Sequence, residues 1–296
     1  MTDPCAIHLL PADDPRFPTA LLAIPGCPSE LWYAGWLDAL DAPAVAIVGS
    51  RAASAVALEI ATRLAADLAE RGVTIVSGLA RGVDSAAHRG ALSRGRTVAV
   101  LGSGPDVIYP PEHRDLARAI ADRGLVLSEY PPGTPPHPGR FPMRNRIISG
   151  LSRAVVVIEA HERSGSLITA RCALQQGREV MAVPGNPLTG RSKGAHALIR
   201  DGAKIVECAD DILEELGLVA NSDESPTSGA SALVPTSCGD SILSGMEPGQ
   251  AYDLDALGGH SGLDAVRLLP RLLDLELRGL VRRVGGGRFM RSARTC

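Results

Sequence analysis

Short runs of apolar residues without an internal charge recur along the middle of the chain. Between them lie longer stretches in which apolar residues repeat at helical spacing. Uninterrupted apolar strands that alternate with amphipathic helices are typical of a parallel sheet covered on both faces. The pattern therefore predicts a doubly wound, mostly parallel α/β domain, with strands at residues 44–48, 73–76, 98–101, 125–127, 154–158 and 180–183 and helices at 55–70, 85–93, 112–122 and 207–216.

The segments around this domain, which we place at residues 44–217, differ in composition. Residues 1–43 are rich in proline and acidic residues, and we expect a lead-in segment that packs on the sheet domain through its aromatic side chains. Residues 218–239 are rich in Ser, Thr, Pro and Gly, which predicts a flexible linker. A second, small domain is expected at residues 240–296.

This last domain has the outline of a winged helix, because its pattern predicts three helices and a two-stranded hairpin, at residues 240–246, 253–257, 263–277 and 281–291. Asp253 is placed to cap the second helix. Winged helices bind duplex DNA or protein. Because Asp264 and Asp274 accompany Arg267 and Arg271 in the third helix, we favour protein binding.

The net charge of −3 conceals an uneven distribution. Residues 44–200 hold 20 Lys and Arg against 12 Asp and Glu, whereas residues 1–43 and 201–239 together hold 2 against 14. A basic middle between acidic flanks fits a domain that binds a polyanion. Six scattered cysteines, without a CxxC pair or a Cys/His cluster, predict a reduced protein without a metal or other cofactor. Because the sequence has no leader pattern and no apolar span of membrane length, we expect a cytoplasmic protein.

Glycine and serine follow the carboxyl ends of the predicted strands, where ligands bind in parallel α/β sheets. Such residues let backbone N–H groups approach an anion at a helix N-terminus. The informative turns are Gly49-Ser50-Arg51, residues 77–82, residues 102–104, Ser164-Gly165-Ser166 and residues 184–186. We expect Arg51 to contact a phosphate, because the next acidic residue along the chain is Glu59.

Residues 139–152 read GRFPMRNRIISGLS and contain no carboxylate. Guanidinium groups suit phosphate, and an aromatic ring among them can stack on a base, so we interpret the stretch as an anion-binding platform on a core helix. The alternative is a surface loop whose arginines pair with distant acids. The residues concerned are Arg140, Phe141, Arg144, Asn145 and Arg146.

Several of these residues have structural alternatives. One of the two later arginines can face DNA while the other pairs with Glu129 or Glu159, and Asn145 can cap the following helix. Ser164, Gly165 and Ser166 bind phosphate or cap their own helix, with capping slightly favoured. Asp84 and Glu129 are expected to be structural partners of Arg81 and of the Arg-Asn-Arg run rather than acid–base catalysts.

Taken in order, the motifs resemble those of the bacterial DNA-processing protein A (DprA/Smf) family. The resemblance covers roughly residues 10–216, and the winged-helix tail more loosely. It implies an extended Rossmann fold that binds single-stranded DNA without sequence preference, protects it and loads the RecA recombinase on it, as in natural transformation. It also implies a homodimer and no catalytic activity. The motifs are Gly49-Ser50-Arg51, SGLARGVD at 77–84, Tyr109-Pro110, EYPPG at 129–133, the run from Phe141 to Ser152, SGSLITA at 164–170 and Val183-Pro184-Gly185.

Carried over by position, the resemblance assigns Gly49, Ser50 and Arg51 to the DNA-binding pocket. The family's basic residue before Phe-Pro, often lysine, falls on Arg140, and its aromatic falls on Phe141. Its RNR run falls on residues 144–146. An arginine at position 140 offers a planar guanidinium group with several hydrogen-bond donors, in place of the compact ammonium charge of a lysine. Many members also carry an N-terminal helical domain, for which we expect no room in this chain.

The main rival interpretation is an enzyme. Related Rossmann folds hydrolyse nucleoside monophosphates and use a PGGxGT run followed by a glutamate. Here residues 184–190 read PGNPLTG, and the next carboxylate is the distant Asp201. No histidine lies near a Ser or Cys at triad-like spacing. We therefore expect no catalytic residue. A winged-helix transcription factor with a nucleotide-sensing domain is a third interpretation, which the weakly basic third helix disfavours.

Overall fold

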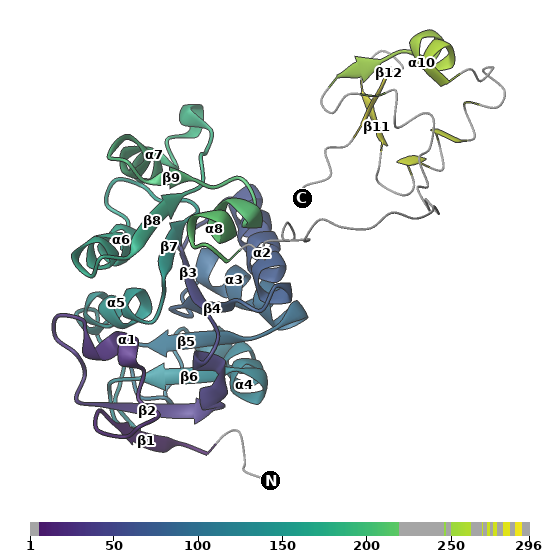
Figure 1. Cartoon of the computed structure of the whole chain (residues 1–296). Coiled ribbons are helices and arrows are strands. Elements are labelled where there is room, and N and C mark those ends of the chain that lie inside the picture. The colour runs from purple at the N-terminus through teal and green to yellow at the C-terminus, as the bar shows by residue number, and fades with distance from the viewer. Residues whose placement is uncertain are drawn as a thin grey trace, which may run out of the picture. The chain divides into compact units, whose positions relative to one another are not determined.

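The computed structural model describes residues 6–218, 246, 250–261, 268, 271–272, 275–276, 281–284 and 288–291. The contacts within the chain divide it into two compact units, residues 1–219 and 220–296 (Figure 1). Residues 219–239 of the expected linker lie outside the described residues, as does most of the helix expected at 240–246.

The first unit is built on one nine-stranded sheet with the order β1-β2-β6-β5-β4-β3-β7-β8-β9. All neighbours from β6 to β9 are parallel, while β2 is antiparallel to both β6 and β1. The strands are β1 (His8–Pro11), β2 (Glu30–Gly35), β3 (Ala44–Val48), β4 (Thr74–Ser77), β5 (Thr97–Leu101), β6 (Leu125–Ser128), β7 (Ala154–Val157), β8 (Glu179–Ala182) and β9 (Lys204–Ile205).

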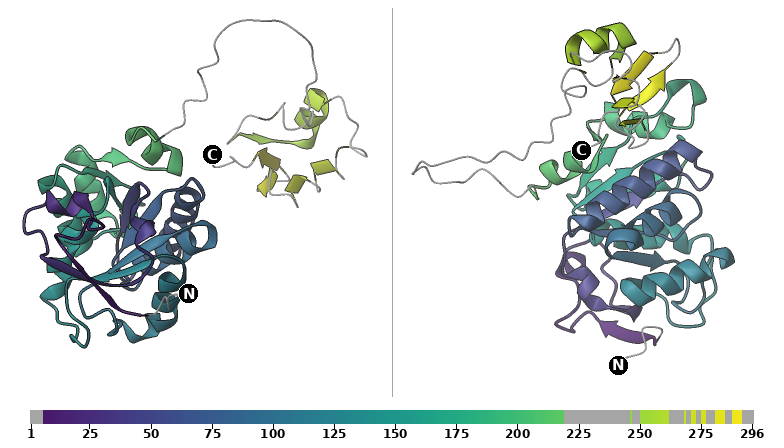
Figure 2. Two further views of the ribbon diagram at one scale, coloured as in Figure 1. Left: turned by 60° about the horizontal axis from the view of Figure 1, so that its bottom comes forward. Right: turned by 90° about the vertical axis from the view of Figure 1, so that its right-hand side faces the viewer.

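Helices cover both faces of this sheet (Figures 1 and 2). One face packs against α1 (Thr19–Leu22), α5 (Arg140–Gly150), α6 (Ser166–Gln175) and α7 (Lys193–Arg200). The other packs against α2 (Ala55–Glu70), α3 (Val83–Arg94), α4 (Arg114–Arg123) and α8 (Ala209–Glu215). Three 3-10 turns complete the unit, at η1 (Leu37–Leu40), η2 (Pro111–His113) and η3 (Pro187–Thr189).

The predicted doubly wound, mostly parallel fold is confirmed, and its six predicted strands are found within one residue of their expected ends. Every residue of β3 is buried, as expected for a strand covered on both faces. The helix expected at 55–70 is α2, whose N-cap Ser54 accepts a hydrogen bond from Ala57 N at 3.2 Å. Apolar periodicity thus located the central layers of the domain.

The N-terminal segment differs from the expected lead-in. Instead of only lying on the domain, it extends the sheet by two strands, β1 and β2. Its aromatic side chains are divided, since Phe17 and Tyr33 are buried in the core beside α5, whereas Trp36 is exposed. The cause is the pairing of β2 with β6, which forms between residues far apart in the sequence.

In the second unit, the described residues form a three-stranded antiparallel sheet and a helix. The strands are β10 (Ala251–Tyr252), β11 (Val281–Val284) and β12 (Arg288–Arg291), in the order β10-β12-β11, beside α10 (Leu254–Ser261). Asp253 caps α10 by accepting a hydrogen bond from Ala256 N at 2.8 Å, as expected. β11 and β12 form the expected hairpin. Most of the helix expected at 263–277 lies outside the described residues.

Among the described residues, no helix is both long enough and apolar enough to cross a membrane.

Candidate functional site

A pocket of about 490 Å³ opens at the carboxyl edge of the sheet, between the ends of β3 and β7. The chain leaves these two neighbouring strands toward opposite faces of the sheet, so the pocket lies at the topological switch point, where doubly wound sheets bind ligands. Its walls come from the turn after β3, the start of α3, the first half of α5, and the loop that leads from β7 into α6.

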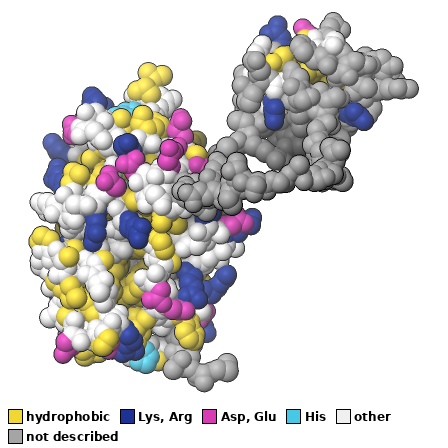
Figure 3. All heavy atoms as spheres, viewed as in Figure 1, with side chains coloured by type: hydrophobic (Ala, Val, Ile, Leu, Met, Phe, Trp, Pro, Cys, Tyr) yellow, Lys and Arg dark blue, Asp and Glu magenta, His cyan; other side chains and the backbone are white. Residues whose placement is uncertain are grey.

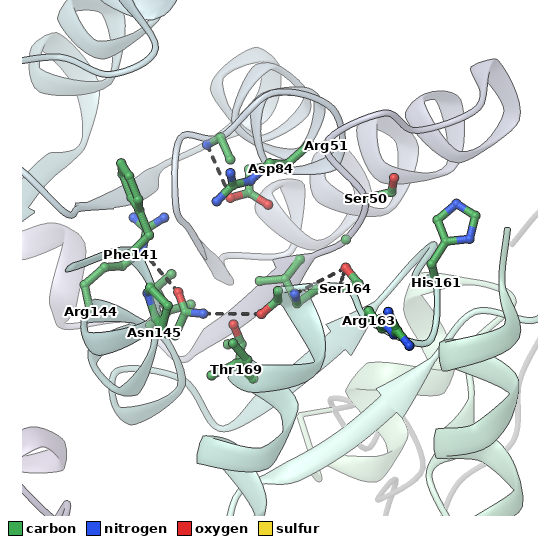
Figure 4. Close-up of a pocket in the computed structure, with 18 of the residues that line it drawn as sticks. Ser50, Arg51, Asp84, Phe141, Arg144, Asn145, His161, Arg163, Ser164 and Thr169 are labelled. Carbon is green, nitrogen blue, oxygen red and sulfur yellow. Dashed lines mark hydrogen bonds between the residues drawn. The ribbon is translucent and has the colours of Figure 1, made fainter. Parts of the chain in front are cut away.

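The structure brings nine of the eleven sequence-predicted site residues together in the wall of this pocket. These are Gly49, Ser50, Arg51, Phe141, Arg144, Asn145, Ser164, Gly165 and Ser166. In Figure 4, Phe141 and His161 lie at opposite sides of the pocket, with Arg51 and Asp84 above it and Thr169 below. The other two predicted residues, Arg140 and Arg146, do not line it.

Close contact between two loops shapes the upper wall. Gly82 has a φ of 78°, and a Cβ atom on it would lie 2.2 Å from the carbonyl oxygen of Ser50. Only glycine therefore lets the loop before α3 pack on the turn after β3. In the same loop Leu79 is fully buried with a φ of 58°, a left-handed conformation that is uncommon for a residue with a side chain. Backbone strain of this kind gathers at ligand sites.

Arg51 is exposed at the mouth of the pocket. Its guanidinium carbon lies 5.7 Å from the centre of the Phe141 ring, in cation–π range. Within the described part of the chain the side chain makes no hydrogen bond and no ion pair. Its charge is therefore available to an anionic ligand.

Arg163 and His161 are exposed in the opposite wall, and sequence reasoning missed both. Neither side chain bonds to another described residue. The signal that points to Arg163 is its place directly before the Ser164-Gly165-Ser166 turn. The adjacent Glu162 made the segment look like an ordinary solvated charge run. Basic and acidic side chains are interspersed on the face drawn in Figure 3. Arg51 and Arg163 at the pocket are distinguished by making no hydrogen bond or ion pair with a described residue.

Phe141 lies in the first turn of α5 with its ring against Gly102, where a Cβ atom would come within 2.8 Å of the ring. The close approach to the end of β5 requires glycine at position 102. Tyr109 packs on the ring with a centroid distance of 5.5 Å and an interplanar angle of 36°. Phe141 is thus a supported, partly exposed aromatic surface rather than an ordinary core residue.

Arg144 and Asp84 line the pocket, and both are buried. Arg144 donates hydrogen bonds to the carbonyl oxygens of Gly78, at 2.9 Å, and Val100. Burial lowers the pKa of Arg144 to about 10, against the opposing effect of Asp84. Asp84 accepts bonds from the backbone N–H groups of Gly78 and Ala80, and burial raises its pKa although Arg144 acts against the rise.

Of the two later arginines in the stretch, Arg146 is the one that pairs with Glu129, and it also donates to the carbonyl oxygen of Gly26 at 2.8 Å. Arg140 begins α5 with its guanidinium carbon 4.9 Å from the centre of the Tyr130 ring and donates to the carbonyl oxygen of Pro135 at 2.5 Å. Both side chains are held outside the pocket by these contacts.

The structure decides between the alternatives for three local roles. Asn145 does not cap a helix, because α5 already begins at Arg140, and its amide instead donates to the carbonyl oxygen of Gly165 at 3.4 Å. Gly165 of the expected capping turn is the N-cap of α6, without a side-chain cap bond, and Ser164 Oγ accepts from Ser166 N at 3.4 Å. Arg81 pairs with Glu112 at 2.5 Å rather than with Asp84, whose charged neighbour is Arg144 of the Arg-Asn-Arg run.

The residues behind the enzyme alternative lie beside the pocket. Four residues of the 184–190 run, Pro184, Gly185, Asn186 and Thr189, line a separate cavity of about 350 Å³, in whose wall Glu159 is buried. Both carboxylate oxygens of Glu159 are engaged by Ser54, at 3.2 Å to its backbone N and 2.7 Å to its hydroxyl. No cluster of His, Cys, Asp and Glu among the described residues is arranged to hold a metal ion.

The sheet, its two helical layers and the pocket at the switch point define the chain as a Rossmann-like α/β protein. Comparison with known families is more specific. The sequence model of a family described as DNA recombination-mediator protein A matches residues 8–217, and that of the DprA winged helix domain matches residues 226–287. The chain belongs to the DNA recombination-mediator protein A family.

Individual relatives cover most of the chain. It is 42% identical to Protein Smf of Escherichia coli over 98% of this chain and 78% of that protein. The X-ray structure of DNA processing protein A from Streptococcus pneumoniae is similar with a TM-score of 0.68 and 46% identity, over 71% of this chain and 74% of that one. A structure of DNA processing protein A from Helicobacter pylori, described by its single-stranded DNA binding mode, is similar with a TM-score of 0.66 and 31% identity, over 72% of this chain and 96% of that one.

Proposed function

We propose that the protein binds single-stranded DNA without sequence preference at the pocket between β3 and β7. The observation that carries this proposal is the position of Arg51, which makes no hydrogen bond or ion pair with a described residue, beside Phe141, an aromatic ring held at the pocket wall. Guanidinium groups bind phosphate, and aromatic rings stack on any base. Membership of a DNA recombination-mediator family and similarity to a protein described by its single-stranded DNA binding support it.

The shape of the site favours a single strand over a duplex. Phe141 lies inside the wall of a pocket at the sheet edge, so a base reaches its ring only when it is not stacked and paired within a duplex. Because phosphate and π-face contacts carry no sequence information, binding is expected to be sequence-tolerant. The turns at Ser50 and at Ser164–Ser166 add hydroxyl and backbone N–H groups for phosphate oxygens.

We further propose that the bound strand is protected and then passed to the RecA recombinase, as in DNA uptake by natural transformation. The family described as a recombination mediator supports this step. A homodimer would engage one strand at two pockets and gain affinity from the second, intramolecular contact. Measuring the rate of RecA filament formation on a DNA strand precoated with single-strand-binding protein tests the transfer, and we expect the full chain to raise that rate.

The direct test compares binding of fluorescent oligothymidylate, a mixed-sequence single strand and a duplex of the same length. We expect similar affinity for both single strands and weaker binding of the duplex. Arg51→Ala removes one phosphate contact, and one contact to a single strand contributes a salt exponent of about 0.7, so binding should weaken about fivefold at 0.1 M salt and about twofold at 0.3 M.

Arg153→Ala is the matched control. Arg153 is also exposed and makes no side-chain bond within the described residues, but it lies just before β7, at the amino edge of the sheet. It should bind DNA like the wild type. Equal binding of Arg51→Ala and Arg153→Ala at low salt would show that the pocket is not the DNA site.

A further inference from the structure

A second, smaller cavity of about 80 Å³ lies beside Phe141, which lines both it and the main pocket. Arg51 and Arg144 also line both cavities, and the smaller one adds Arg81 and Tyr109. Three guanidinium groups therefore surround a space that is large enough for a small anion but much smaller than the main pocket. None of the residues that contribute only to this cavity was assigned to the site from the sequence.

The three arginines around the small cavity differ in the contacts that they make with the rest of the protein. Arg144 is buried and bonded to backbone carbonyl groups, while Arg51 makes no hydrogen bond or ion pair in the described part of the chain. Arg81 pairs with Glu112, and the two side chains are 59% and 47% exposed. Exposed ion pairs of this kind contribute little to stability, so Arg81 can exchange its carboxylate for another anion at small cost.

We propose that the cavity is a second phosphate subsite, which takes a phosphodiester group adjacent to the nucleotide at Phe141. Arg81 and Arg51 hold this phosphate from two sides, and Arg81 leaves Glu112 to do so. The inference rests on the proposed function, since it extends the same bound strand past the aromatic ring. A phosphate fits the observations better than a base does, because the cavity is small and is lined by cations.

This arrangement predicts opposite effects for the two members of one ion pair. Arg81→Ala should weaken binding of oligothymidylate about fivefold at 0.1 M salt and reduce the magnitude of the salt exponent by about 0.7. Glu112→Gln should strengthen binding about twofold or more, because it frees Arg81 and removes a negative charge next to the phosphate. If the pair were only structural, neither variant would strengthen binding, and that result would overturn the inference.

Arg94→Ala and Glu70→Gln provide the matched control. Arg94 and Glu70 form an ion pair at 2.8 Å, each is 57% exposed, and neither residue lines either cavity. Both control variants should bind as the wild type does. Unfolding temperatures of all four variants establish that the comparison is made between folded proteins.

An oligothymidylate with one neutral methylphosphonate linkage identifies the contact chemically. The linkage is moved along the strand one position at a time. At one position it should weaken binding by the wild type but should not weaken binding by Arg81→Ala. If the wild type binds single strands but Arg81→Ala matches Arg94→Ala in every assay, the second subsite is wrong and the main pocket stands. If the wild type fails to bind single strands at all, both proposals fail.

Discussion

His88 gives the protein a specific sensitivity to acid, which follows from its hydrogen bonds. The side chain is fully buried in α3, with Nδ1 2.7 Å from Thr97 Oγ1. Thr97 gives its only hydroxyl proton to the carbonyl oxygen of Ile75 at 2.7 Å, so Nδ1 of the histidine must be the donor. Nε2 is then the unprotonated nitrogen, and it is buried without a partner in the described residues.

Protonation of Nε2 would place a charged N–H group where nothing accepts its bond. Burial, assisted by the charge of Arg144, accordingly lowers the pKa of His88 from 6.5 to about 3 in the folded state. The unfolded chain then binds this proton first, so the full stability is present above about pH 6.5 and is lost as the pH falls toward 3. The loss from this residue alone should reach about 1 kcal/mol at pH 5.5 and about 3 kcal/mol at pH 4.5.

The assay is urea unfolding of the full chain at pH 7.5 and pH 5.5 for the wild type and His88→Asn. Asparagine keeps an N–H donor for Thr97 but does not titrate, so the variant should be less stable at pH 7.5 yet lose about 1 kcal/mol less on acidification. His161→Asn, at an exposed position, should retain the wild-type pH dependence. Parallel loss of stability in the wild type and His88→Asn would refute the assignment of a neutral buried ring.

Two substitutions test the contributions of base stacking and of free space in the DNA pocket, separately from the contribution of its charges. Phe141→Ala should weaken single-strand binding by about 1–3 kcal/mol without changing the salt exponent, measured by anisotropy titrations at several salt concentrations. Gly165→Ala should raise stability by about 0.4–1 kcal/mol, because the residue has a φ of −61° and a Cβ atom would meet nothing within 4 Å. The same methyl group intrudes on the pocket and should weaken DNA binding by about 1–3 kcal/mol, so unchanged affinity would place the strand away from Gly165.

The central layers of the fold were predictable because burial on both faces leaves a plain sequence pattern. β3 and β7 are uninterrupted apolar runs, and their carboxyl ends lie within two residues of the next glycine or charge. β1 was not predictable in this way, since two of its four residues are exposed and the strand lies at the sheet edge. β9 has only two residues, both exposed. A short edge strand forms because it pairs with a neighbouring strand, and that pairing is a tertiary contact that the local sequence does not reveal.

The functional site, like the fold, was predictable from the sequence only in part. Glycine turns at strand ends converge because parallel strands end at one edge, so Ser50 and Ser164 could be grouped from the sequence alone. Which arginine finds a carboxylate depends on distances between separate elements. Arg146 lies in reach of Glu129 and Arg81 in reach of Glu112, whereas Arg163 makes no ion pair with a described residue despite its acidic neighbour in the sequence. Sequence reasoning therefore identified the pocket better than it identified the free charges within it.

The placement of β2 has a consequence for synthesis on the ribosome. β2 pairs with β1 on one side and with β6 on the other, and in the second pair Trp32 faces Ser128. A two-stranded ribbon alone is at best marginally stable in water. At a translation rate of about 5–20 residues per second, the first strands wait roughly 5 to 20 seconds for their permanent neighbour. During that interval the apolar side chains of β2 have only the β1 ribbon beside them, so we expect this segment of the nascent domain to need shielding from aggregation.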